Sequence, residues 1–247
     1  MRILLVEDDR ALARGLVAAL GAASMVVDTV ESGEEALEFC RLYDFDMVLL
    51  ASGLPDMEGY DAVRRLRAAR LATPVLMLCE ASTPQAKVKG FAVGADDVLA
   101  KPFDAQELVA RIQAVVRRAK GFAQPTLAVG ELCLNLGSRE AAVAGTPIHL
   151  TGKEYAILEL LMLRKGMVLT KEAFLNHLYG GMDEPEVKII DVFICKLRKK
   201  LAQAGADNVI GTVWGRGYMM RDPAAKPQHA PAAPAAPKAA PALARAA

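Results

Sequence analysis

The chain has 247 residues, 53% of them hydrophobic, and a formal net charge of +1. This length suits two domains of ordinary size, and this composition excludes a wholly disordered protein. Its apolar runs, such as Val75 to Cys79, are too short to span a bilayer, and nothing at the N-terminus resembles a signal peptide. The four cysteines have no close paired spacing. We therefore expect a reducing cytoplasm, with neither a disulfide framework nor a metal site.

Residues 1–120 alternate between strand-like and helix-like segments. Strands are expected at 2–9, 25–30, 47–50, 73–79 and 97–100, and helices at 11–21, 32–43, 59–69, 83–93 and 104–120. Apolar strands that alternate with helices predict an α/β fold, a doubly wound parallel sheet of five strands covered on both faces. Sites in such sheets form at the carboxyl ends of the strands. The residues expected there are Asp8, Asp9, Ala51, Cys79 and Lys101.

The pattern changes after residue 120. Short strands are expected between 127 and 149, followed by helices at about 151–164, 170–178 and 186–203. Two further strands, at 209–220 around Gly215 and Gly217, predict a hairpin. We therefore expect a first domain at 1–120, a linker at 121–126 and a second domain at 127–222. Residues 223–247, rich in alanine and proline, are expected to form a disordered tail.

Two groups of motifs carry a resemblance to a known family. The strings VEDD, GLPDMEGY, GADDVLAKPF and ELVARIQAVVRR resemble a response-regulator receiver domain. The strings LTGKEYAILELL, LTKEAFLNHLYGGMDEPEVKIIDVFICKLRKKL and TVWGRGYMMRD resemble a winged helix-turn-helix domain of the OmpR/PhoB type. The whole is similar to the CtrA-type cell-cycle regulators of alphaproteobacteria. The resemblance implies a flavodoxin-like receiver followed by a DNA-binding domain, in a transcription regulator of a two-component phosphorelay rather than an enzyme.

The resemblance also implies a phosphorylation site at the strand ends. Receivers use an aspartate on the third strand as phosphoryl acceptor, an acidic pair that helps to hold Mg²⁺, and a lysine. Here Asp8 and Asp9 match the acidic pair and Lys101 matches the lysine, but Ala51 stands at the acceptor position. Because a methyl group cannot attack a phosphoryl donor, we expect an atypical receiver that is not phosphorylated.

Two more positions depart from the family pattern. Cys79 stands where the family has Thr or Ser, and Val98 where it has an aromatic residue. Three departures together favour a natural loss of the acceptor aspartate. The sequence alone does not decide whether Ala51 is natural or a laboratory substitution. Cys79 is expected to be a small buried side chain and Val98 to serve packing. No cofactor is expected. Weak Mg²⁺ binding at Asp8 and Asp9 stays open, since these charges and Lys101 would also compensate one another.

Residues 186–205 predict a helix with one apolar and one basic face. Val187, Ile190, Ile194, Leu197 and Leu201 recur at helical spacing and are expected to face a core. The residues expected to contact double-stranded DNA are Lys188, Ile189, Val192, Cys195, Lys196, Arg198 and Lys199, with Arg216 of the hairpin. The pattern alone also fits a solvated or membrane-surface helix. The resemblance implies the major groove, whose width admits a helix and whose base edges identify each base pair.

The predicted DNA contacts divide by chemistry. Lysines would meet phosphates, whereas Ile189 and Val192 would meet thymine methyl groups, which favours AT-rich paired half-sites. Trp214 is expected to pack within the hairpin rather than to stack on a base. The acidic loop 180–186 matches a region that can contact RNA polymerase in the family. The same acids would also favour a helix start, and the sequence does not separate the two.

The resemblance implies partners as well as DNA. A dimer face is expected at Lys87, Asp96, Asp97, Glu107, Arg111 and Arg118, although the same residues fit an ordinary exposed charge mosaic. The partner would be a second copy or an intact paralogue. The leading hypothesis is a sequence-specific transcription regulator that acts independently of receiver phosphorylation. The alternative is a decoy or adaptor that binds a histidine kinase or phosphotransferase. No membrane partner is expected.

Overall fold

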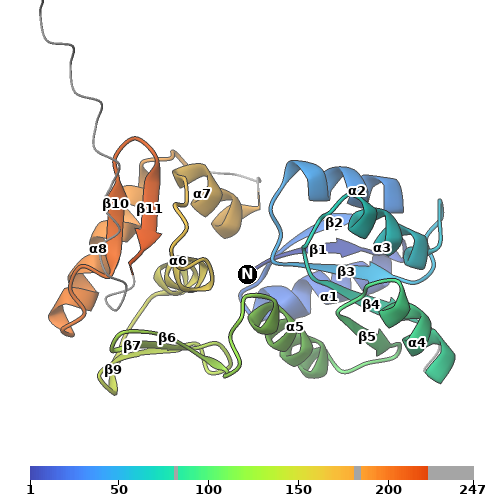
Figure 1. The fold of residues 1–247 in the computed structure, drawn as a ribbon, viewed down its shortest axis with the longest axis horizontal. Helices are drawn as coiled ribbons and strands as arrows, with labels where there is room; N and C mark the ends of the chain where they lie inside the picture. The colour runs from blue at the N-terminus through green and yellow to red at the C-terminus, as the bar shows by residue number, and fades with distance from the viewer. Residues whose placement is uncertain (81–82, 181–184, 222–247) are drawn as a thin grey trace, which may run out of the picture.

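The structure is a computed structural model that describes residues 1–80, 83–180 and 185–221. An α/β domain lies on the right in Figure 1 and a second domain on the left, with the N-terminus between them. The predicted disordered tail, residues 223–247, lies outside the described residues. So does most of the acidic loop at 180–186, because residues 181–184 are not described.

The first domain is a five-stranded parallel sheet with helices on both faces, in the strand order β2-β1-β3-β4-β5. The strands are β1 (Arg2–Val6), β2 (Val26–Val30), β3 (Met47–Ala51), β4 (Val75–Cys79) and β5 (Asp97–Ala100). The helices are α1 (Arg10–Ala22), α2 (Gly33–Leu42), α3 (Gly59–Ala68), α4 (Pro84–Ala92) and α5 (Ala105–Ala119). The predicted doubly wound fold is confirmed.

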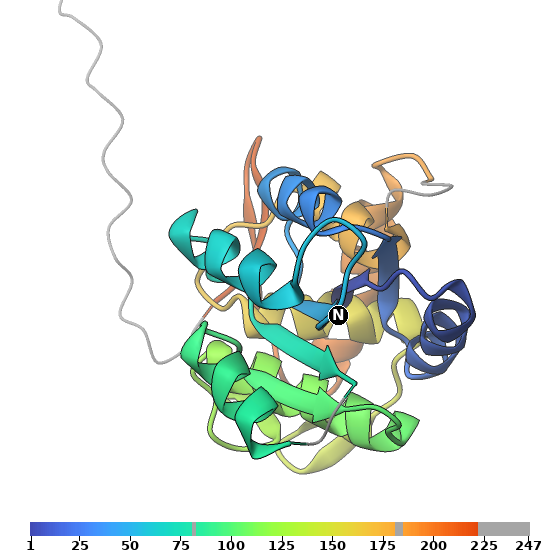
Figure 2. The ribbon, with the colours of Figure 1, turned by 90° about the vertical axis from the view of Figure 1, so that its right-hand side faces the viewer.

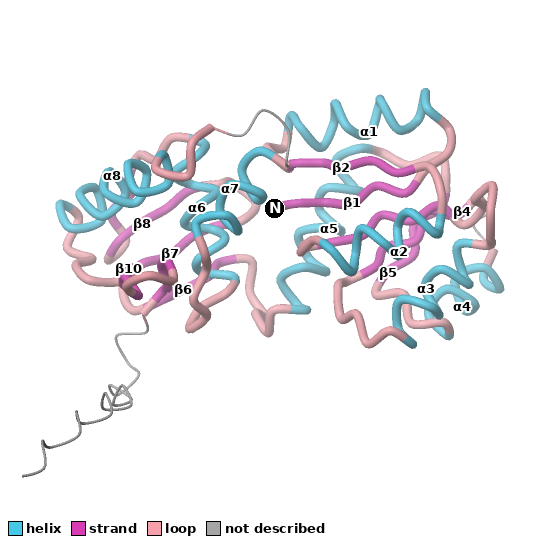
Figure 3. Tube along the Cα trace, turned by 90° about the horizontal axis from the view of Figure 1, so that it is seen from above, coloured by secondary structure: helices cyan, strands magenta, loops and turns pink. Residues whose placement is uncertain are grey.

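Side chains alternate across the central strands and build two hydrophobic cores. On β1, Ile3 and Leu5 belong to the core that α1 and α5 cover, whereas Leu4 and Val6 belong to the core under α2 and α3. All four side chains are fully buried. Figure 3 shows α1 on one side of the sheet and α2 to α4 on the other, and Figure 2 gives the view from the receiver end. Strands buried on both faces explain why the sequence showed continuous apolar runs.

Polar side chains fix where the helices begin. The Ser32 side chain accepts a hydrogen bond from the Glu35 backbone N–H at the start of α2. Thr83 caps α4 in the same way and Asp104 caps α5. These caps position the loops at one end of the sheet, where the functional side chains of the receiver gather.

The second domain combines a small sheet, three helices and a hairpin. Its antiparallel sheet contains β6 (Thr126–Val129), β7 (Leu132–Asn135), β8 (Glu140–Val143) and β9 (Thr146–Ile148). Then follow α6 (Gly152–Leu163), α7 (Lys171–Tyr179), α8 (Ile189–Gln203), and the hairpin of β10 (Ile210–Val213) and β11 (Gly217–Met220). This is the predicted winged helix-turn-helix arrangement.

Helix α8 begins later than the sequence predicted. Its first residue is Ile189, and Lys188 is its N-cap. Ile190, Ile194, Leu197 and Leu201 are buried, but Val187 precedes the helix and is 37% exposed. The prediction that Val187 faces the core is therefore wrong, because the helical spacing does not extend to a residue outside the helix.

The two domains meet at the amino-terminal ends of β1, β2 and β3, the end of the sheet opposite to Ala51 and Lys101. Gly180, which ends α7, lies so close to β2 that a Cβ there would stand 2.8 Å from Val26 Cγ1. One continuous hydrophobic core runs from α1 and α5 into α6 and α7. Among the described helices, none has the length and apolar character needed to cross a bilayer.

Candidate functional site

Lys101 is the centre of a charged cluster at the carboxyl ends of the receiver strands. Its Nζ atom lies 2.8 Å from Glu7 Oε2 and 2.9 Å from Glu80 Oε1. The Glu7 side chain is 2% exposed and that of Glu80 is 74% exposed. Burial alone would lower the pKa of Lys101, but hydrogen bonds to these two carboxylates outweigh it and raise the pKa. The positive charge of Lys101 is thus already paired with the carboxylates of Glu7 and Glu80.

The acidic partner of Lys101 differs from the predicted one. Asp9 is the N-cap of α1, and its carboxylate accepts hydrogen bonds from the backbone N–H groups of Ala11 and Leu12. These hydrogen bonds, first from Leu12, lower the pKa of Asp9. Asp8 is exposed. The pairing of Asp8 and Asp9 as the acidic group beside Lys101 is therefore corrected: buried Glu7 takes that place.

The sequence contained a signal for Glu7. Successive side chains in a strand point to opposite faces, so Glu7 continues the row of Ile3 and Leu5 beyond the end of β1. Glu80, directly after β4, was also missed, because an exposed glutamate beside a loop has no distinctive pattern.

Apolar and sulfur groups occupy the rest of this end of the sheet. Ala51, the last residue of β3, is 1% exposed, and Cys79, the last residue of β4, is 2% exposed. The Cys79 Sγ atom lies 3.7 Å from the Tyr60 hydroxyl oxygen, and Lys89 Nζ lies 3.9 Å from the centre of the Tyr60 ring. Val98 is buried against α4, where a Cβ on Gly90 would stand 2.7 Å from Val98 Cγ2. Cys79 and Val98 are packed, as expected.

The donor set at the strand ends does not fit a resident Mg²⁺ ion. Mg²⁺ prefers several oxygen ligands in octahedral geometry. Of the three acidic side chains that follow β1, Glu7 is bound to Lys101, Asp9 caps α1, and Asp8 is exposed. Within the parts of the chain that the structure describes, no group of three histidine, cysteine, aspartate or glutamate side chains could hold a metal ion.

The solvent side of α8 is open. Val192 is 45% exposed, and Cys195, Lys196 and Lys199 are also exposed. Lys188 is exposed and Ile189 half-buried at the start of the helix. In Figure 1, α8 lies on the side of its domain that faces away from the receiver. The basic and apolar groups predicted to meet DNA therefore share one accessible surface.

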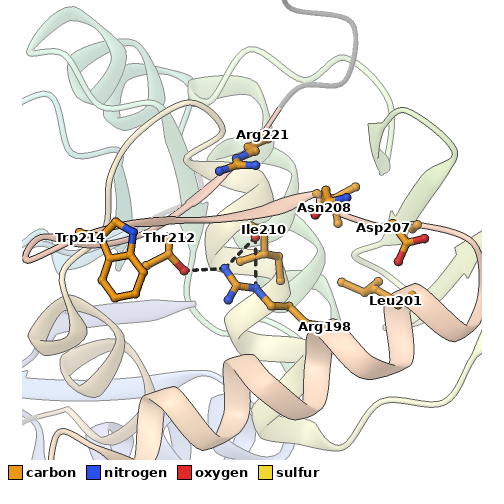
Figure 4. Close-up of a pocket in the computed structure, with 11 residues that line it drawn as sticks. Arg198, Leu201, Asp207, Asn208, Ile210, Thr212, Trp214 and Arg221 are labelled. Carbon is orange, nitrogen blue, oxygen red and sulfur yellow. Dashed lines mark hydrogen bonds between the residues drawn. The ribbon is translucent and has the colours of Figure 1, made fainter. Parts of the chain in front are cut away.

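Arg198 departs from the predicted role. Its guanidinium donates hydrogen bonds to the Ile210 carbonyl oxygen, at 2.8 Å from Nη2 and 3.2 Å from Nε, and to the Thr212 hydroxyl at 2.9 Å. Figure 4 shows these bonds between α8 and the hairpin. Arg198 is half-buried and tethers β10 to the helix. The structure thus shows Arg198 supporting the hairpin, and its direct contact with DNA stays a prediction.

Trp214 also departs from its prediction. It lies in the turn of the hairpin and is 91% exposed, so it does not pack within the hairpin. Arg216 in the same turn is exposed as well. Gly217 has φ +134°, and a Cβ there would collide with the Leu169 carbonyl. The glycine thus lets the hairpin approach the loop before α7 while its tip projects both side chains outward.

Asp191 joins three elements behind this surface. Its carboxylate lies 2.7 Å from Lys171 Nζ on α7 and accepts a hydrogen bond at 2.6 Å from the Tyr218 hydroxyl on β11. The bond from Lys171 contributes most to lowering the pKa of Asp191. Burial, together with Asp191, raises the pKa of Tyr218 to about 12. The sequence analysis missed this triad, since its members are far apart in the chain.

Five of the six residues of the expected dimer face have partners within the chain. Arg111 pairs with Asp97 at 2.9 Å and with Glu107 at 2.8 Å, and Asp96 pairs with Arg67 at 2.8 Å. The Arg118 side chain donates to the Ala114 carbonyl, whereas Lys87 is exposed on α4. Pairs between two chains would have to replace or extend these bonds, so the dimer face stays a prediction.

Comparisons with known families agree with this geometry. The family "Response regulator receiver domain" matches residues 3–113, and "Transcriptional regulatory protein, C terminal" matches residues 145–220. The first covers the five-stranded domain, and the second covers all three helices and the hairpin of the other domain.

Known relatives match both domains together. The "Cell cycle response regulator CtrA" of Brucella ovis is 55% identical, and that of Brucella anthropi 54%, each across 92% of this chain and 98% of the relative. The crystal structure of DrrB, an OmpR/PhoB homologue of Thermotoga maritima, is 30% identical across 89% of this chain and 98% of its own, with a TM-score of 0.44. The chain therefore belongs to the OmpR/PhoB-type response regulators, among the relatives of the cell-cycle regulator CtrA.

Proposed function

We propose that this protein is a sequence-specific DNA-binding regulator of transcription that acts in the cytoplasm without phosphorylation of its receiver. The observation that carries the proposal is the cluster at the strand ends. Ala51 offers no nucleophile there, and the Lys101 ammonium is already paired with Glu7 and Glu80. A receiver of this kind keeps its fold but lacks the chemistry of phosphoryl transfer.

The open face of α8 supports the DNA-binding half of the proposal. Lys196 and Lys199 would pair with phosphates, and this would make affinity salt-dependent. Val192 would contact thymine methyl groups in the major groove, which favours AT-rich half-sites. Arg216 would reach the adjacent minor groove from the hairpin, with Trp214 beside it. Since α8 faces away from the receiver, DNA would reach it without separation of the domains.

The proposed assembly on DNA is a pair of chains on two half-sites. Half-sites about 10–11 base pairs apart would place both α8 helices on one face of the duplex. The second chain would be another copy or a paralogue with an intact acceptor. A histidine kinase or phosphotransferase would still find a folded receiver surface, and RNA polymerase would be a partner of the loop at 180–186.

Fluorescence anisotropy with labelled duplexes tests the proposal. We expect Lys196→Ala to weaken binding to all sequences and to reduce the slope of log affinity against log salt by about one. Val192→Ala should relax base preference with a smaller loss of affinity. Arg14→Ala removes an exposed positive charge from α1 and is the matched control, for which we expect unchanged binding.

Arg198→Ala separates a tether from a contact. It should weaken binding by loosening the hairpin, so the salt slope should stay near that of the wild type. A drop in the salt slope as large as that of Lys196→Ala would instead assign Arg198 to a phosphate. Unchanged affinity in all of these variants would contradict DNA binding through α8, and the decoy or adaptor function would then be favoured.

A further inference from the structure

A buried cluster of charged and titratable groups lies between the two domains. Asp46, just before β3, faces His177 on α7, with 3.6 Å between Asp46 Oδ2 and His177 Nδ1. The two side chains are 2% and 5% exposed. Asp46 Oδ2 also accepts a hydrogen bond at 2.8 Å from the Arg2 backbone N–H. The contact thus joins the receiver sheet to α7 through groups that water does not reach.

The remaining groups come from α6 and its C-cap Arg164, from the N-terminus and from Asp44. Arg164 Nη1 lies 3.1 Å from Asp44, and Arg164 Nη2 lies 3.9 Å from Asp46 Oδ1. The Met1 ammonium lies 3.0 Å from Glu159 Oε2 and 3.4 Å from His177 Nε2. Among the described residues, Asp46 Oδ1 has no hydrogen-bond partner. Unlike the surrounding apolar contacts, this cluster depends on the protonation state of its members.

The arrangement requires a neutral His177. The Met1 ammonium has only protons to donate, so His177 Nε2 accepts, and the ring proton lies on Nδ1, toward Asp46. Burial lowers the pKa of His177 to about 3, and the Met1 ammonium acts in the same direction. Burial alone would raise the pKa of Asp46, but His177, the Met1 ammonium and the Arg2 backbone N–H outweigh it and lower that pKa.

We propose that Asp46 and His177 form a pH-sensitive latch between the domains, which holds the receiver on α6 and α7 at neutral pH and is released when His177 takes up a proton. In the docked state the imidazolium would lie beside the Met1 ammonium and the Arg2 and Arg164 side chains, with Asp46 and Glu159 as the opposing charges. In the separated state it would be hydrated. Protonation therefore favours separation.

The direction of the pH dependence follows from linkage. The docked state has the lower histidine pKa, so the separated state binds more protons below the ordinary value of 6.5. Docking is strongest above about pH 6.5 and weakens as the pH falls, by up to about tenfold in the ratio of docked to separated protein for each pH unit. This release requires neither phosphate nor DNA.

Hydrogen exchange of the full chain, measured by mass spectrometry between pH 7.5 and 5, tests the latch. After correction for the intrinsic exchange rate, protection of peptides at 24–30 and 171–179 should fall up to about tenfold per pH unit below about pH 6.5. His177→Gln keeps an acceptor but cannot gain a charge, so its protection should not follow pH. His149→Gln, at an exposed position, is the control and should behave as the wild type.

Asp46→Asn tests the second half of the latch. It should expose the same two segments already at pH 7.5, while peptides from β3 and β4 keep their protection, which shows that the receiver remains folded. Equal pH dependence in wild type and His177→Gln would overturn the proposal. So would a loss of protection that spreads evenly over both domains, or normal docking in Asp46→Asn.

Discussion

Lys101 holds together the charges that remain at the strand ends. Glu7 is almost fully buried beside it, whereas Glu80 is mostly exposed, so the two ion pairs differ in strength. A buried carboxylate that loses its only close cation is costly, while an exposed pair contributes little. The buried pair of Lys101 and Glu7 therefore contributes to the stability of the fold.

Lys101→Met should therefore destabilise the protein by about 3 kcal/mol at neutral pH, because it leaves Glu7 buried without a counter-charge. Glu80→Gln is the matched control and should change stability by well under about 1 kcal/mol. Urea unfolding followed by circular dichroism measures both. Equal effects would mean that the exposed pair matters as much as the buried one.

The same pair predicts a dependence on alkaline pH. The folded pKa of Lys101 is raised above the ordinary value of 10.5. The stability that the pair contributes is therefore fully present below pH 10.5 and is lost as the pH rises through the folded pKa. The difference in unfolding free energy between wild type and Lys101→Met should shrink above pH 10.5. A difference that stays constant across that range would contradict the assignment.

At the scale of elements, the helices and strands largely followed from the sequence, and their contacts did not. Apolar runs that alternate with helix-like segments predicted the five strands and the helices between them. No sequence signal indicated that Asp9 caps α1, because an aspartate suits both a helix cap and an acidic site. Arg198, expected to be exposed, is half-buried, and Trp214, expected to be packed, is exposed. Which side chain lies under the hairpin depends on how the hairpin crosses α8.

The start of α1 provides a test of this correction. Asp9→Ala removes the acceptor for two backbone N–H groups and should lower the melting temperature at neutral pH. The pKa of Asp9 is lowered in the folded state, so the loss should disappear in acid, below that pKa. Asp8→Ala, one residue earlier and exposed, should have little effect. A larger effect of Asp8→Ala would restore the acidic pair that the sequence suggested.

For the whole molecule, the orientation of the domains decides which surfaces are available. The receiver touches α6 and α7 through the amino-terminal ends of its strands, the Lys101 cluster lies at the opposite end, and α8 lies on the far side of the second domain (Figure 1). No sequence pattern predicted this contact, because Asp46 and His177 are 131 positions apart. The arrangement explains how the receiver would stabilise the second domain.

The central claim is that the receiver does not accept a phosphoryl group. Incubation with a radiolabelled, phosphorylated histidine phosphotransferase measures it most directly, with a related receiver that carries the acceptor aspartate as positive control. We expect label on the control and none on this chain, because Ala51 has no nucleophile and Lys101 is already paired. An alkali-labile, hydroxylamine-sensitive acyl phosphate within residues 1–120 would contradict the account.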